Sequence, residues 1–154
     1  MSPDANDVIL GEVTDLVREF AARFDRARVD GPTPHPPAGI RLVLSCLAPG
    51  TARITLYPSD DDIDVHTGEH TWIELLKRKR DNPQRLQELR PILDAVVNGR
   101  FEETIWRVRG TIVRSRAVLC EPDGRAFFSA RRFRRLTFLD PRAKRTYVKY
   151  EPYS

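Results

Sequence analysis

The feature that most constrains the fold is a two-residue alternation in the last third of the chain. The segments FEETIWRVRG, TIVRSRAVLC, RAFFSARRF and RTYVKY lie between residues 101 and 150 and are rich in β-branched and aromatic residues. Turn residues separate them near Gly110, at EPDG (121–124) and at LDPRAK (139–144). Because side chains alternate across a strand, this pattern predicts a run of antiparallel strands.

Helical periodicity marks two other parts of the chain. Between Val8 and Ala27, apolar residues recur at steps of three and four, which is typical of one face of an amphipathic helix. These residues are Ile9, Val13, Leu16, Val17, Phe20 and Phe24. A second helix is predicted from Asn82 to the Asn-Gly pair at 98–99, with a kink or a break at Pro91.

Two strands and a short helix are predicted between these helices. The strands are IRLVLSCL (40–47), which is apolar enough to lie centrally in a sheet, and TARITLY (51–57). The short helix is expected over residues 71–80, because Thr71 and Glu74 match a capping box.

This order of elements predicts an α+β fold with helices packed on one face of an antiparallel sheet. A chain of 154 residues can bury a sizeable core, so we expect a single domain over 1–154. The proline-rich stretch DGPTPHPPAG (30–39) is expected to form an extended spacer inside that domain.

Composition bears on the compartment. No apolar run approaches the roughly 20 residues that a membrane-spanning helix needs. The first ten residues are acidic and contain no hydrophobic signal core. Cys46 and Cys120 stand alone in apolar runs, which favours two buried, reduced thiols over a disulfide. We therefore expect a cytoplasmic protein without a membrane partner.

The segment SDDDIDVHTGEHTWIEL (59–75) raises the question of a metal site. His66, Glu69 and His70 form the H-x-x-E-H motif of inverted zinc peptidases, but that chemistry needs both histidines on one helix, and Gly68 opposes a helix. Asp60, Asp62 and Asp64 match the opening of a calcium loop, but its glycine and its bidentate glutamate are replaced by Val65 and Thr71.

A divalent-metal site with mixed ligands remains a third alternative for this segment. The favoured interpretation is a solvated turn followed by a half-exposed edge strand, in which Asp60, Asp62 and Asp64 present an acidic edge to a partner. The chain has no nucleophile elbow, phosphate-binding loop or dinucleotide fingerprint. We predict no catalytic residue, no metal and no cofactor, and we favour a non-enzymatic protein.

The predicted C-terminal strands separate arginine from apolar residues. Trp106 and Val108 are expected on an apolar face, with Trp106 buried against the N-terminal helix. The opposite face is expected to be an arginine grid with two aromatic residues. Its members are Arg107, Arg109, Arg114, Arg116, Arg125, Phe127, Arg131 and Phe133.

Charge is distributed unevenly along the chain. Residues 1–99 contain 12 Lys and Arg against 16 Asp and Glu, whereas residues 100–154 contain 14 against 6. Of the 26 basic residues, 22 are arginine, a bias that is also typical of GC-rich bacterial coding sequences. The arginine face is therefore either a binding face for an anionic partner or a solvated surface.

The sequence favours an interaction protein that docks a macromolecular partner by charge complementarity. One concrete form is a bacterial immunity-type protein that neutralises a toxin, and a protein partner is favoured over nucleic acid. The alternatives are a nucleic-acid-binding protein that uses the arginine-rich sheet face and a metal-dependent enzyme centred on His66 and His70.

Overall fold

The structure is a computed structural model that describes residues 5–36, 39–76, 81–120, 122–124, 126–132 and 141–154, with residues 5–7, 76 and 126–132 described at the level of the backbone. Along these residues the elements are α1 (Ala5–Ala21), β1 (Ala27–Pro34), β2 (Ile40–Cys46), β3 (Ile54–Pro58), β4 (Asp62–Thr67), β5 (Thr71–Leu76), α2 (Asn82–Val97), β6 (Phe101–Val108), β7 (Thr111–Cys120), β8 (Ala126–Arg132) and β9 (Lys144–Lys149).

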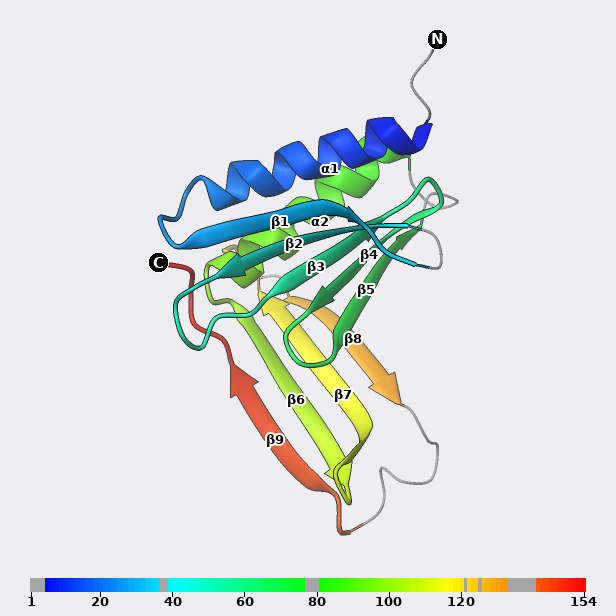
Figure 1. Cartoon of the computed structure of the whole chain (residues 1–154). Coiled ribbons are helices and arrows are strands. Elements are labelled where there is room, and N and C mark those ends of the chain that lie inside the picture. The colour runs from blue at the N-terminus through cyan, green and yellow to red at the C-terminus, as the bar shows by residue number, and fades with distance from the viewer. Residues whose placement is uncertain (1–4, 37–38, 77–80, 121, 125, 133–140) are drawn as a thin grey trace.

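The strands form two antiparallel sheets. The first has the order β1-β2-β3-β4-β5, and the second has the order β8-β7-β6-β9. Both helices lie along one face of the first sheet, and the second sheet extends away from it (Figure 1). Helix α1 contacts β1, β2 and β3, while α2 contacts both β5 and β7 and so joins the two sheets. The α+β prediction is confirmed, with two sheets in place of one.

The main core lies between the helices and the first sheet. Apolar side chains of α1 and α2 meet the alternate, inward-facing residues of β2, β3, β4 and β5, as the two periodicities require. The buried members include Val13, Phe20, Leu42, Leu44, Ile54, Leu56, Ile63, Val65, Leu89, Leu93 and Val96. Strand β2 is paired on both sides, as its apolar sequence predicts.

The helix predicted over residues 71–80 was wrong where the structure describes it. Thr71–Leu76 forms β5, which pairs with β4 through the turn that contains Gly68. The hydroxyl of Thr71 donates to the buried Glu103 carboxylate 2.5 Å away instead of capping a helix. This long-range acceptor and the β-forming residues Trp72 and Ile73 outweigh the local capping pattern.

The proline-rich stretch also differs from the prediction. Residues 30–34 belong to β1, an edge strand of the first sheet, where proline is tolerated because one side of the strand needs no ladder partner. Helix α1 ends at Ala21, earlier than predicted, and Ala27 already begins β1.

Helix α2 begins at Asn82, as predicted. Asp81 is the N-cap, and its side chain accepts from the backbone of Gln84 in a capping box. Asn98 and Gly99 end the helix as predicted, with Gly99 in the left-handed region. Pro91 lies inside one continuous helical element and does not split it.

The chain returns to the first sheet after β9. The Tyr153 hydroxyl donates to the Ala52 carbonyl at 2.7 Å, and the Tyr153 amide donates to the Val97 carbonyl at 2.8 Å. Cys46 and Cys120 are free thiols, but both are half-buried and not buried as expected. Among the described residues, no helix combines the length and the apolar character that crossing a membrane requires.

Candidate functional site

Trp106 lies on the opposite face of the second sheet from the one predicted. The buried residues of β6 are Phe101, Glu103 and Ile105, so the alternation leaves Trp106 half-buried on the outward face. It pairs across the strands with Arg114, whose guanidinium carbon lies 4.6 Å from the centroid of the indole ring. The prediction of a Trp106 buried against the N-terminal helix was wrong.

The error has two physical causes. Glu103 occupies an inward position although it is charged, which disguises the apolar face of β6. A β-bulge at Trp106–Arg107 then shifts the register, and Arg109 with Gly110 forms a two-residue hairpin turn with positive φ at both positions. Arg107 and Arg109 therefore do not share a face with Arg114 and Arg116.

Nine positions on three strands make up the outward surface that we call the basic face. Cross-strand pairs place Trp106 between Arg114 and Arg145, and Thr104 between Arg116 and Tyr147. The full set is Glu102, Thr104 and Trp106 on β6, Arg114, Arg116 and Val118 on β7, and Arg145, Tyr147 and Lys149 on β9. It holds four cationic side chains and one carboxylate, since directly opposed residues lie on the same face of a sheet.

Aromatic groups are integrated into this charge pattern. The Arg145 guanidinium carbon lies 5.8 Å from the centroid of the Trp106 ring, on which the Arg114 guanidinium also lies. Such contacts hold cations against an aromatic ring. Tyr147 is 56% exposed. A hydrogen bond to Glu102 raises the pKa of Tyr147, because the neighbouring carboxylate disfavours a phenolate.

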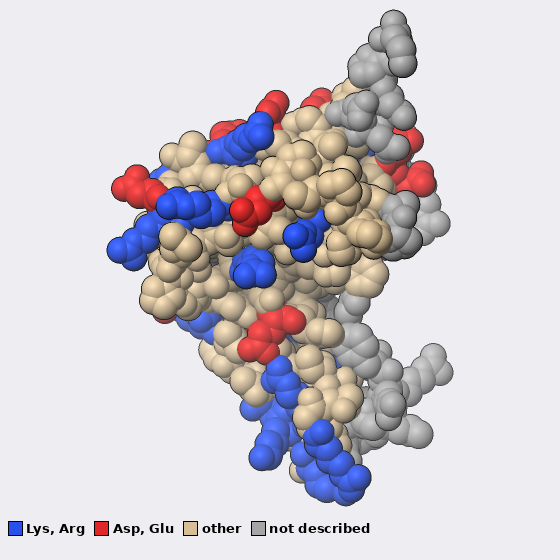
Figure 2. Space-filling model, viewed as in Figure 1, with Lys and Arg blue, Asp and Glu red and all other residues tan. Residues whose placement is uncertain are grey.

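Basic side chains also gather at the free end of the second sheet. Figure 2 shows them at the lower end of the molecule, over the β6–β7 hairpin and the start of β9. Arg109 is exposed in that hairpin turn. Of the other predicted grid members, Arg125 and Phe133 lie outside the described residues. Phe127 and Arg131 belong to β8, at register positions opposite the buried Leu119 and Ser115.

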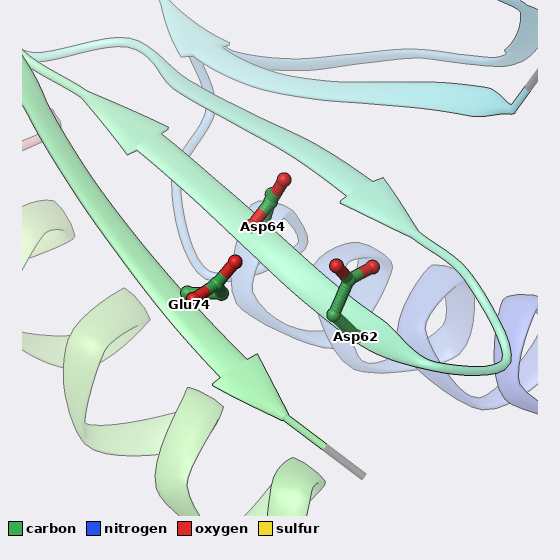
Figure 3. A group of neighbouring side chains, drawn as sticks. All are labelled: Asp62, Asp64 and Glu74. Atoms are coloured by element: carbon green, nitrogen blue, oxygen red, sulfur yellow. The ribbon is translucent and has the colours of Figure 1, made fainter.

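The acidic segment is not a sheet edge. Strand β4 lies between β3 and β5, and Asp60 sits in the turn before it. Asp62 and Asp64 project from β4 beside Glu74 of β5, and one carboxylate oxygen of each lies within 4.8 Å of the others (Figure 3). The edge prediction was wrong because β5, which covers that edge, was assigned to a helix.

The three carboxylates supply the oxygen ligands that hard divalent cations prefer. Two of them already accept protein hydrogen bonds: Ser59 Oγ donates to Asp62 at 2.5 Å, and Trp72 Nε1 donates to Asp64 at 2.9 Å. The cluster is thus also stable as a hydrogen-bonded surface group. Converging carboxylates alone, two half-buried and one exposed, do not define a metal site.

The histidines are not arranged as the zinc-peptidase motif requires. His66 lies on β4, where its ring contacts Tyr57 and Trp72 with centroid distances of 5.2 and 5.4 Å. His70 lies in the turn before β5, so the two imidazoles do not share a helix face. The absence of a specific metal at His66, Glu69 and His70 stays a prediction.

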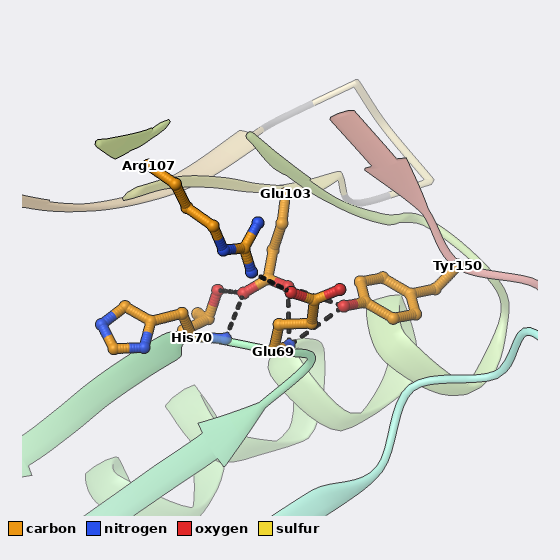
Figure 4. Close-up of polar contacts among 6 residues, drawn as sticks. Glu69, His70, Glu103, Arg107 and Tyr150 are labelled. Atoms are coloured by element: carbon orange, nitrogen blue, oxygen red, sulfur yellow. Dashed lines mark hydrogen bonds and ion pairs between the residues drawn. The ribbon is translucent and has the colours of Figure 1, made fainter. Parts of the chain in front are cut away.

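A buried carboxylate that the sequence interpretation missed joins the two sheets. Glu103 on β6 is 1% exposed and accepts four hydrogen bonds from the β4–β5 turn, from β5 and from the residue that follows β9 (Figure 4). The donors are the Glu69 amide at 2.8 Å, the His70 amide at 3.0 Å, Thr71 Oγ1 at 2.5 Å and the Tyr150 hydroxyl at 2.6 Å. We call this group the Glu103 joint.

Neighbouring residues reinforce the joint. Arg107 donates to the Glu69 carboxylate at 2.6 Å, which ties β6 to the same turn. Gly68 has a φ of +63°, and a Cβ there would lie 2.4 Å from Glu103 Oε2, so glycine is required for this close approach. With its lone pairs satisfied by protein donors, Glu103 is suited to hold structure and not to catalyse a reaction. Its position between Phe101 and Ile105 was the signal available in the sequence.

A recess of about 250 Å³ opens beside the joint. It is lined by Arg53, Thr55, His66, Thr67, Gly68, Glu69, His70, Thr71 and Trp72. The lining mixes a guanidinium, two imidazoles and a carboxylate that is already paired with Arg107. This mixture of signs does not select one ligand chemistry.

Comparison with known proteins identifies no relative: no protein-family model, no curated protein and no solved structure matches the chain.

Proposed function

We propose that this chain is a non-enzymatic interaction protein that docks an acidic protein surface on its basic face. The observation that carries the proposal is the composition of that face, which combines four cationic side chains with a half-buried tryptophan and an exposed tyrosine. Arginine, tryptophan and tyrosine are the residues most enriched in the energetically important centres of protein interfaces.

The contacts of Trp106 favour a protein partner over nucleic acid. Single-stranded nucleic acids bind protein sheets by stacking bases on open aromatic rings. Here the Arg114 and Arg145 guanidiniums lie over the indole, 4.6 and 5.8 Å from its centroid, and compete with a base for that ring. The same guanidiniums can donate to carboxylates on a partner through their outer N–H groups.

A toxin-neutralising protein of the immunity type is one form of this proposal, since such a protein needs a charged complementary surface and no active site. The proposal includes a cytoplasmic location, because both cysteines are free thiols and free thiols are typical of reducing compartments. The acidic cluster on the first sheet takes no part in it.

The experiment compares two triple variants in binding to polyglutamate and to single-stranded DNA. The first, Arg114→Ala/Arg116→Ala/Arg145→Ala, removes three cations from the basic face. The matched control, Arg18→Ala/Arg26→Ala/Arg41→Ala, removes three exposed cations from other parts of the protein. Both variants change the net charge equally, so a difference between them reports position and not total charge.

We expect the first variant to bind polyglutamate about tenfold more weakly, because exposed ion pairs contribute about 0.2–1 kcal/mol each. The control should stay within about twofold of the unmodified protein. Equal affinities for the two variants would overturn the proposal. Tighter binding to DNA than to polyglutamate, with an affinity that falls steeply with salt, would instead establish the nucleic-acid alternative.

A further inference from the structure

Strand β9 lies at one edge of the second sheet, and its outer side has no neighbouring strand among the described residues. The strand order places β9 next to β6 alone, and within the described residues no strand pairs with the other side of Lys144–Lys149. A strand at a sheet edge offers backbone N–H and C=O groups to any segment that can pair with it.

The direction in which each β9 backbone group points follows from one hydrogen bond. The Tyr150 amide donates to the Phe101 carbonyl at 3.2 Å, so this pair is of the hydrogen-bonded kind. Hydrogen-bonded and non-hydrogen-bonded pairs alternate along an antiparallel ladder. Thr146 and Val148 therefore direct their backbone N–H and C=O groups toward β6. The residues that alternate with them direct these groups outward, away from the sheet. The outward set is Arg145, Tyr147 and Lys149.

The same edge already pairs with backbone at its end. Glu151 continues the outward set, and its amide donates to the Gly50 carbonyl at 2.9 Å. Thr51 and Glu151 form a parallel bridge there. The edge is thus able to accept an extended segment. The chain itself already pairs with the edge at one position, Glu151.

The outward backbone groups and the basic face belong to the same residues. Arg145, Tyr147 and Lys149 are exposed, and their side chains lie on the basic face. A strand added beside them would lie about 4.8 Å away and would place every second side chain on that face. Carboxylates opposite Arg145 and Lys149 would be attracted, whereas a second copy of this cationic edge would be repelled.

We infer that the partner contributes an extended segment that adds to the outer edge of β9, with acidic residues at alternating positions. This inference rests on the proposed function and specifies its mode of binding. The acidic residues lie on the basic face, where they meet Arg145 and Lys149, and the residues between them lie on the other face of the sheet. Backbone hydrogen bonds then supply affinity, and the charge pattern supplies selectivity.

The test uses synthetic peptides in which glutamate and valine alternate, about ten residues long, the upper range of an ordinary strand. One peptide is N-methylated at its glutamates, and a second is N-methylated at its valines. Only one of these two sets points its N–H groups at β9, because backbone groups alternate along a strand. We expect one N-methylated peptide to lose at least about tenfold in affinity and the other to keep it. Equal affinities would overturn strand addition.

A protein variant tests the same edge from the other side. Tyr147→Pro removes an N–H that points outward, so the hydrogen bonds between β6 and β9 remain, and Tyr147→Ala is the control for the lost phenol. The proline variant should bind the unmodified peptide at least about tenfold more weakly than the alanine variant. If the proline and alanine variants bind equally while Arg114→Ala/Arg116→Ala/Arg145→Ala loses binding, the basic face is still the docking surface, but the partner does not bind by strand addition. If that triple variant also binds normally, the proposed function itself fails.

Discussion

The two sheets of this protein are built from similar strands but are covered differently. Both helices pack along one face of the first sheet, and its inward residues are almost all in the main core. The second sheet joins that core through Phe101, Ala117 and Leu119 near one end, while Ile105 and Val113 are buried apart from it. The first sheet therefore provides most of the stabilising burial, and the second projects as an attached layer.

Charge also differs between the part of the chain that forms the helices and the first sheet and the part that forms the second sheet. Residues 1–99 carry an excess of acidic side chains, 16 against 12, and residues 100–154 carry an excess of basic ones, 14 against 6. An attached sheet with one face in solvent can carry like charges at a low cost, because water screens them. A surface that is not needed for the core is thus free to be specialised for a partner.

The attachment of the second sheet to the first depends most on the Glu103 joint, which fixes the second sheet to the turn between β4 and β5. We expect Glu103→Ala to lower the free energy of unfolding by about 4 kcal/mol or more, since each buried donor left without an acceptor costs about 1–3 kcal/mol. Chemical denaturation measures the change. Hydrogen exchange should show that the amides of Glu69 and His70 lose their protection.

The adjacent residue provides the control for this change. Glu102 is half-buried on the outward face, so Glu102→Ala should cost less than about 1 kcal/mol. Similar costs for Glu102→Ala and Glu103→Ala would mean that the second sheet is held by apolar packing alone.

The two aromatic side chains of β6 test which face is buried. Phe101 is fully buried and stacks on Tyr150 at a centroid distance of 4.9 Å, whereas Trp106 is half-buried on the basic face. Phe101→Ala should cost about 3–5 kcal/mol, as buried aromatic truncations do. Trp106→Ala should cost about 1 kcal/mol, the common value for point mutants. A larger loss of stability for Trp106→Ala than for Phe101→Ala would show that the face of β6 that carries Trp106 is the buried one.

Two buried tyrosines, one associated with each sheet, make the stability of the protein sensitive to alkaline pH. Burial, followed by the hydrogen bond to Glu103, raises the pKa of Tyr150, which belongs to the joint. Burial also raises the pKa of Tyr153, whose hydroxyl donates to the Ala52 carbonyl of the segment before β3. In the unfolded chain both lose their protons near pH 10, while the folded chain retains them.

The unfolded state therefore binds fewer protons above about pH 10, and stability falls as pH rises. Each tyrosine contributes a slope of up to about 1.4 kcal/mol per pH unit. Tyr153→Phe should be less stable than the unmodified protein at neutral pH, because it loses a hydrogen bond, but should lose stability less steeply above pH 10. Denaturation at a series of pH values measures both effects. Parallel curves for the two proteins would show that Tyr153 ionises normally in the folded state.

Local periodicity was sufficient to predict most of the elements. The helical period of α1, the strand-forming sequences of β2 and β3, and the alternation of β6 and β7 are properties of short segments, and the structure confirms these elements. The α+β class follows from their order. Strand β5 could not be predicted in this way, because the partner that holds Thr71 in a strand is Glu103, which lies 32 residues away.

The predicted arginine face was wrong in part for a similar reason. The alternation on β7 correctly separated Arg114 and Arg116 from Val113, Ala117 and Leu119. On β6, the assignment of the inward face depended on whether Glu103 or Trp106 points inward, and hydrophobicity alone favours the tryptophan. Only the four donors that surround Glu103 decide the question, and they come from other parts of the chain.

The smallest expected effect concerns α2, the helix that contacts both sheets. Asp81 caps it, and the Asp81 carboxylate accepts from the Gln84 amide at 2.9 Å, while the Gln84 side chain accepts from the Asp81 amide at 3.2 Å. Asp81→Ala should lower the free energy of unfolding by about 1 kcal/mol, the usual cost of losing an N-cap side chain. Because α2 packs against β5 and β7, this loss should affect both sheets equally, and hydrogen exchange should increase by the same factor in β3 and in β6. A larger increase in β6 alone would mean that the second sheet opens independently of the first.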